Sequence, residues 1–131
     1  MTVWTSEELD RIGGADELRI RSLRRDGTLS NPVTIWVVRV ADGLYVRSAY
    51  GDRAWLRATR VRHEGRISAG GIETDVAFEA AAPETADAID AAYRKKYHHH
   101  GAQYVDSAVT PEARATTIRL LPRETERRGR A

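Results

Sequence analysis

The chain has 131 residues, of which 41% are hydrophobic and 31% charged, with a net charge of +2 and no cysteine. This length and balance predict one globular domain, and the lack of cysteine excludes disulfides and thiolate metal sites and favours a cytoplasmic location. No apolar run approaches the roughly 20 residues of a membrane span, and acidic and basic side chains are mixed along the chain, so we expect neither a membrane nor nucleic acid as a partner.

The first predicted element is a short helix within residues 1–14. Thr5 and Glu8 have the spacing of a capping box, and Trp4 and Leu9 have that of a hydrophobic staple. A helix of this kind orients the chain, and we assign it no chemistry.

Residues 18–48 predict a three-stranded meander. Its strands are 18–23, 33–40 and 44–48. The middle strand is apolar on both faces, as expected of a strand in the interior of a sheet. Asp42 and Gly43 predict the tight turn that leads into the third strand.

Two loops of this meander carry arginines, hydroxyls and glycines. Residues 24–32 join the first two strands, and residues 49–55 follow the third. Because both loops come to the ends of one meander, together they are suited to hold an anionic cofactor. An ordinary meander with solvated loops fits the same pattern.

Trp36 interrupts the aliphatic run of the middle strand with a large flat side chain. A buried tryptophan commonly belongs to the core. The alternative is that Trp36 forms a wall against which a planar ligand ring lies.

The middle of the chain predicts a helix, a hairpin and a second helix. Residues 54–62 form the first helix, and strands 66–69 and 72–79 alternate apolar and polar side chains. The main helix occupies residues 83–97. Its core stripe recurs every fourth residue, at Ile89, Tyr93 and Tyr97.

Three consecutive histidines, 98–100, close the main helix. Consecutive side chains on a helix point in different directions, so these three are poorly placed to share one tetrahedral metal ion. We therefore interpret them as a solvated helix end, favoured by the helix dipole, and expect no metal site. Metal binding is the lesser alternative.

The last part of the chain predicts a connecting loop at 103–109, a single helical turn from Pro111, and a final strand at 116–121. We expect residues 1–122 to form a single domain and residues 123–131 to be a charged, disordered tail.

The sequence carries no motif of an activated nucleophile, and its glycine pairs do not form a phosphate loop between a strand and a helix. If the protein is an enzyme, its chemistry is therefore expected to belong to a bound cofactor, which the protein binds and orients.

Several stretches resemble a small bacterial family, domain of unknown function 2255. They are Trp-Thr at 4–5, Pro-Val-Thr-Ile-Trp-Val-Val at 32–38, Leu-Tyr-Val-Arg-Ser-Ala-Tyr-Gly at 44–51, Ala-Tyr-Arg-Lys-Lys-Tyr at 92–97 and Thr-Thr-Ile-Arg-Leu at 116–120. The order of elements is also similar to the split β-barrel of FMN-binding pyridoxamine-phosphate oxidases and deazaflavin-dependent nitroreductases.

The resemblance implies a cofactor site. Basic and hydroxyl side chains of the early strands and loops would bind the phosphate: Arg24, Arg25, Ser30, Ser48 and Arg53. The flavin ring would lie near Thr34 and Trp36, with Tyr50 or Trp55 at its edge. In related barrels this cleft lies at a dimer interface, so the resemblance also implies a homodimer.

We therefore expect an α+β fold, a mostly antiparallel split β-barrel of about six strands with two to three flanking helices. Two functions stay open. One is an oxidoreductase that uses FMN or a deazaflavin on a small organic substrate. The other is a cofactor-free protein that binds a small-molecule ligand, or a non-redox enzyme, in the same cleft.

Overall fold

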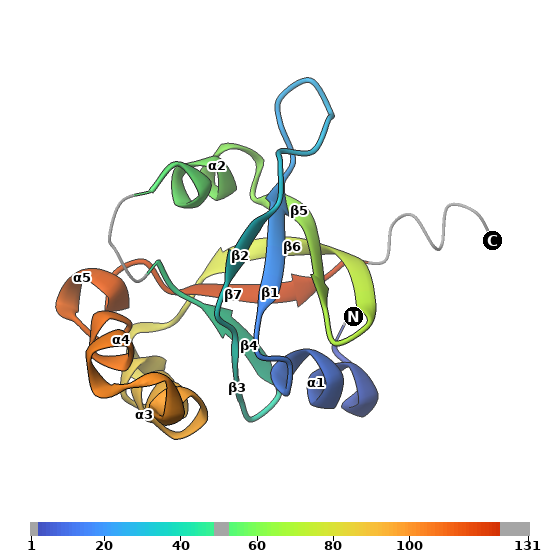
Figure 1. The fold of residues 1–131 in the computed structure, drawn as a ribbon. Helices are drawn as coiled ribbons and strands as arrows, with labels where there is room; N and C mark the ends of the chain where they lie inside the picture. The colour runs from blue at the N-terminus through green and yellow to red at the C-terminus, as the bar shows by residue number, and fades with distance from the viewer. Residues whose placement is uncertain (1–2, 49–52, 124–131) are drawn as a thin grey trace.

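The computed structural model describes residues 3–48 and 53–123. Within these ranges, seven strands form one curled sheet in the order β2-β1-β5-β6-β7-β4-β3, and every strand pair is antiparallel (Figure 1). The strands are β1 (Leu18–Ser22), β2 (Val33–Ile35), β3 (Val38–Val40), β4 (Gly43–Val46), β5 (Glu64–Ala69), β6 (Ile72–Ala80) and β7 (Ile118–Pro122). This α+β half-barrel confirms the expected fold class, with slightly more strands than expected.

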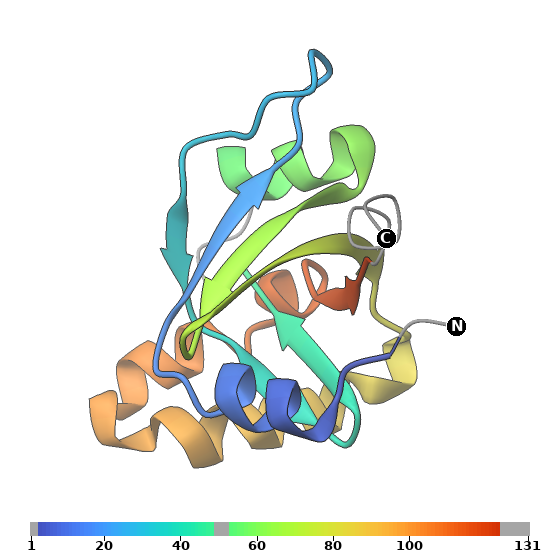
Figure 2. The ribbon, with the colours of Figure 1, turned by 90° about the vertical axis from the view of Figure 1, so that its right-hand side faces the viewer.

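Helices surround the sheet on several sides. They are α1 (Ser6–Gly13), α2 (Ala54–Arg62), α3 (Ala86–Tyr97), α4 (Ala102–Ser107) and α5 (Pro111–Arg114), with short 3-10 turns η1 (Pro83–Thr85) and η2 (His98–His100). Helices α3, α4 and α5 gather on one side, while α2 and α1 lie toward opposite ends of the sheet (Figures 1 and 2). No helix in the described part of the chain has the length and apolar character to cross a membrane.

The prediction of one continuous strand at 33–40 is wrong. This stretch divides at Trp36 and Val37 into β2 and β3, which lie at opposite edges of the sheet. The main chain of Val37 is bound by side chains instead of by a neighbouring strand. The Tyr97 hydroxyl lies 3.2 Å from the Val37 nitrogen and 3.1 Å from its oxygen, and Lys96 Nζ donates to that oxygen at 2.6 Å. The chain can therefore leave one edge of the sheet and join the other without losing these hydrogen bonds.

The predicted loop at 103–109 is also wrong, because residues 102–107 form α4. Gly101, with a φ of 107°, separates this helix from the preceding 3-10 turn. Val105 and Ala108 are buried against the aromatic stripe of α3, and this packing stabilises a helix too short to form alone.

Local predictions elsewhere are confirmed. The capping box of Thr5 and Glu8 is present at the start of α1. The alternating stretch forms β6, and the single turn from Pro111 forms α5, capped by the Thr110 side chain. The predicted tail lies outside the described residues apart from Arg123.

The interior consists of two hydrophobic clusters. The larger one fills the curled sheet and includes Leu44, Leu120 and Phe78, which are adjacent across β4, β7 and β6. The smaller one lies between β3, β4 and helices α3 and α4, and it contains the predicted stripe of Ile89, Tyr93 and Tyr97. The second cluster forms one side of the candidate site.

Candidate ligand-binding site

A cavity of about 420 Å³ opens between the barrel and the helices on its flank. It is bounded by β2, the end of β4, the beginning of α2, and α3 with α4. The lining residues are Val33, Thr34, Ile35, Trp36, Arg47, Ser48, Arg53, Trp55, Tyr93, Tyr104, Ser107 and Ala108. This size and mixture of apolar walls with a few polar groups are typical of small-molecule sites.

One wall of the cavity is aromatic. Trp36 stacks on Tyr97 with their ring centroids 4.1 Å apart and their planes within 5°. Tyr97 is itself fully buried and hydrogen-bonded to the main chain of Val37. Trp36 thus both packs on the second cluster and lines the cavity, so the two interpretations of this residue are compatible.

Arg47 supplies a buried positive charge at the cavity, and the protein compensates that charge internally. Its guanidinium pairs with Asp90 and donates to the Thr117 hydroxyl at 2.8 Å. It also donates to the main-chain oxygens of Ala108 at 2.9 Å and Ala86 at 3.3 Å. Arg47 therefore ties β4 to α3, and little of its charge is left for an anionic ligand.

Tyr93 is the unusual polar group of this site. Its side chain is 1% exposed and lines the cavity, but its hydroxyl has no hydrogen-bond partner among the described residues. Burial raises the pKa of the Tyr93 phenol, and the charge of Arg47 offsets part of this effect. Tyr93 is therefore a neutral donor, and a buried unpaired donor is costly unless a ligand satisfies it.

The structure brings together five of the residues that the sequence suggested. Thr34, Trp36, Ser48, Arg53 and Trp55 all line this cavity. Tyr50 lies outside the described residues.

The other three suggested residues, Arg24, Arg25 and Ser30, line a separate depression beside α2. Asp26 belongs to the same depression, and hydrogen bonds from the hydroxyl and main-chain N–H of Thr28 lower the pKa of its carboxyl. Asp26 thus stays negatively charged where a phosphate would bind.

Sequence reasoning missed four polar or aromatic lining residues: Arg47, Tyr93, Tyr104 and Ser107. Tyr93 was assigned to the core stripe of the main helix. The spacing of a stripe predicts that a side chain is buried, but it does not show whether its hydroxyl has a hydrogen-bond partner. Tyr104 and Ser107 lay in a segment expected to be a loop. The one available signal for Arg47 was its place at the end of an apolar strand.

The curled sheet with its flanking cavity defines a split β-barrel protein. The chain belongs to the family described as "Uncharacterized protein conserved in bacteria (DUF2255)", whose model matches residues 8–120. Among curated proteins, none matches the sequence.

Three solved structures are similar to this chain at low identity. HutZ, the heme storage protein from Vibrio cholerae, is 11% identical with a TM-score of 0.58, over 83% of this chain and 82% of that one. A FAD and heme binding protein from Mycobacterium smegmatis is 20% identical with a TM-score of 0.49, over 89% and 65%. An F420 reductase is 14% identical with a TM-score of 0.47, over 88% and 90%. At these identities the likeness to HutZ concerns the fold alone.

Proposed function

We propose that the cavity binds a planar heteroaromatic cofactor, FMN or a deazaflavin, and that the protein is an oxidoreductase acting on a small organic substrate. The observation that carries this proposal is the buried hydroxyl of Tyr93, which has no hydrogen-bond partner among the described residues and lies at a cavity with an aromatic wall. A flavin-type ring offers a flat apolar face together with carbonyl oxygens and ring nitrogens that accept hydrogen bonds. Such a ring would satisfy Tyr93 and pack against Trp36.

The lining residues fit both parts of such a cofactor. Trp36, Trp55 and Thr34 would hold the ring, and Arg53 with Ser48 would hold the phosphate. When bound, the cofactor supplies the electron transfer, while the chain binds and orients it and excludes water. HutZ, with the same fold, is named for storing heme, which is also a planar ring system.

The position of two arginines favours a second candidate function. Arg24 and Arg25, two of the residues expected to bind the phosphate, line the other depression, and the charge of Arg47 is already compensated by Asp90. A cavity with reduced positive charge suits a neutral small molecule. The alternative is thus a cofactor-free binding protein, or a non-redox enzyme, with a ligand that accepts a hydrogen bond from Tyr93.

We also propose that the protein is a cytoplasmic homodimer. The two short strands β2 and β3 form the edges of the sheet, and Tyr104 at the cavity is 50% exposed, so a second copy would cover both an edge and the cavity rim. Sedimentation equilibrium of the native protein tests this, and a monomer at micromolar concentration would contradict it.

The first experiment is the visible spectrum of the freshly purified protein, followed by titration with FMN, a deazaflavin and riboflavin. A flavin band or saturable fluorescence quenching is expected. Tyr93→Phe should weaken binding of all three by about 2- to 10-fold, the value of one net hydrogen bond. Arg53→Ala should weaken FMN but spare riboflavin, which lacks the phosphate.

Two outcomes would decide against parts of this proposal. A colourless protein that binds none of the three ligands excludes the cofactor and leaves the cofactor-free function. Loss of FMN affinity in the double variant Arg24→Ala/Arg25→Ala, with unchanged folding, would move the phosphate site to the second depression.

A further inference from the structure

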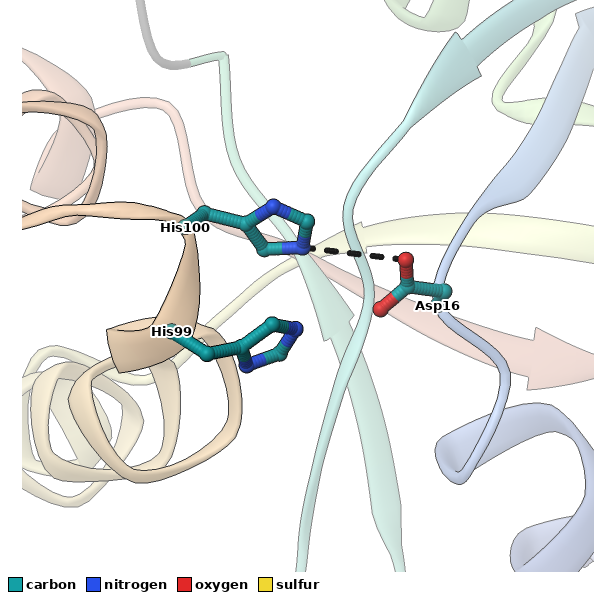
Figure 3. Close-up of side chains that lie close together, drawn as sticks. All are labelled: Asp16, His99 and His100. Atoms are coloured by element: carbon teal, nitrogen blue, oxygen red, sulfur yellow. Dashed lines mark ion pairs between the residues drawn. The ribbon is translucent and has the colours of Figure 1, made fainter.

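Three side chains outside the cavity offer metal ligands at one point. They are Asp16, from the connection between α1 and β1, and His99 and His100, from η2. One ligand atom from each lies within 4.8 Å of the others, and His100 Nε2 is 3.6 Å from Asp16 Oδ2 (Figure 3). We propose that these residues bind a divalent transition metal ion of the Zn²⁺ class.

The distances are close to those that a bound ion requires. Bonds of about 2.0–2.2 Å to nitrogen and oxygen place neighbouring ligand atoms of a tetrahedral ion about 3.4 Å apart. The pair of His100 and Asp16 already meets this spacing. The rings of His99 and His100 have centroids 4.2 Å apart, and all three side chains are exposed, so small rotations bring the third ligand in. Figure 3 shows both imidazoles on the side of η2 that faces Asp16.

Two partly buried hydrogen bonds hold the two segments together before any ion binds. The Tyr97 hydroxyl lies 2.8 Å from the main-chain oxygen of Asp16, and Lys96 Nζ donates to the oxygen of Gly13 at 2.8 Å. Both side chains come from the last turn of α3, directly before the histidines. The α1–β1 connection is therefore anchored beside η2 at two points, and the ligands need little ordering on binding.

The ligand types select the kind of ion. Two imidazoles and one carboxylate suit Zn²⁺, Ni²⁺ or Cu²⁺, whereas Mg²⁺ and Ca²⁺ prefer oxygen ligands alone. Three protein ligands leave a position open for water or another molecule. The ammonium of Lys96 is close enough to interact with Asp16 and opposes a second positive charge, which limits the affinity.

The site adjoins the cavity through one tryptophan. His100 stacks against Trp36, with centroids 5.4 Å apart, and Trp36 lines the cavity. Only the Trp36 side chain would thus separate a bound ion from the cavity. The fluorescence of Trp36 should therefore respond to binding of the ion.

The test is calorimetric titration of the full-length protein, purified without a polyhistidine tag and freed of metal by chelation. Saturable binding of Zn²⁺ is expected, and none of Mg²⁺ at the same concentration. Asp16→Asn, His99→Asn and His100→Asn should each weaken Zn²⁺ binding by at least about tenfold, the range seen when even a supporting partner of a ligand is lost.

The matched control is His98→Asn. His98 belongs to the same run, but its Nδ1 lies 3.0 Å from the Lys95 oxygen and it is not part of the cluster. This variant should bind Zn²⁺ like the native protein. Equal weakening by His98→Asn and His100→Asn, or no saturable Zn²⁺ binding, would overturn the proposal.

A second measurement locates the ion. Cu²⁺ should quench the fluorescence of Trp36, and Trp36→Phe should lose this quenching while keeping Zn²⁺ binding. Circular dichroism checks that each variant is folded. Because Trp4 and Trp55 remain in this variant, the loss is measured against the quenching of the native protein, and quenching of equal extent in Trp36→Phe would contradict the site.

Discussion

Arg47 and Asp90 form an ion pair inside the protein, with Nη1 of Arg47 2.5 Å from Oδ1 of Asp90. The Arg47 side chain is 0% exposed and that of Asp90 13%. The second carboxylate oxygen of Asp90 lies 3.3 Å from Nε of Arg114. The pair joins the end of β4 to α3 at the wall of the cavity, and removal of either partner leaves a buried charge uncompensated.

Asp90→Asn is therefore expected to lower the free energy of unfolding by about 3–5 kcal/mol. The matched control is Asp87→Asn, less than one turn earlier on α3. Asp87 lies 2.7 Å from Arg114, but its side chain is 96% exposed, so its loss should cost about 0–1 kcal/mol. Urea denaturation measures both variants. If both variants lost a similar amount of unfolding free energy, burial would not be what makes the Arg47–Asp90 ion pair important for stability.

Tyr93→Phe should leave the free energy of unfolding unchanged or raise it slightly, because the hydroxyl it removes has no hydrogen-bond partner in residues 3–48 and 53–123. Tyr97→Phe is the contrasting variant on the same helix. The hydroxyl of Tyr97 contacts the main chain of Val37 and Asp16, so its loss should cost about 1–3 kcal/mol. Thermal denaturation without ligand compares them. A clear loss of stability in Tyr93→Phe would mean that the hydroxyl is paired within the free protein.

Lys96 should make stability depend on pH above neutrality. Burial lowers its pKa from 10.5 to about 8, and the charge of Asp16 offsets part of this. Between these two values the unfolded chain binds a proton that the folded protein does not, so the free energy of unfolding should rise with pH. Burial raises the pKa values of Tyr93 and Tyr97 above 10.0, so above that pH the tyrosines act in the opposite direction.

Denaturation of the native protein and Lys96→Met between about pH 8 and 10 tests this shift. The native protein should gain stability relative to the variant across this window. Parallel curves for the two proteins would contradict a lowered pKa at Lys96.

Thr5→Ala should destabilise the protein by about 1 kcal/mol, since it removes the N-cap of α1. Thr5 Oγ1 accepts from the Glu8 N–H at 3.1 Å, and the Glu8 side chain accepts from the Thr5 N–H at 2.8 Å. Ser6→Ala, one residue later, is the control and should change stability little. Equal effects in chemical denaturation would show that the cap is not formed in solution.

The amino-acid sequence by itself determined the elements that depend on neighbours a few residues apart. The capping box at Thr5 and Glu8, the alternation along β6 and the stripe of Ile89, Tyr93 and Tyr97 all follow from spacing within one element. The sequence also indicated five of the twelve residues that line the cavity, among them Trp36, Ser48 and Arg53.

Only the tertiary structure decided the features that depend on contacts across the chain. The predicted strand at 33–40 is interrupted at Val37, whose main-chain oxygen is bound by the side chains of Lys96 and Tyr97. The hydrogen bonding of the Tyr93 hydroxyl and the neighbours of the Arg47 side chain depend on how the helices pack against the sheet. Asp16 lies beside His99 and His100 because partly buried hydrogen bonds from α3 hold the α1–β1 connection next to η2. Spacing along the chain carries no information on such contacts, since they form only when the sheet and the helices are assembled.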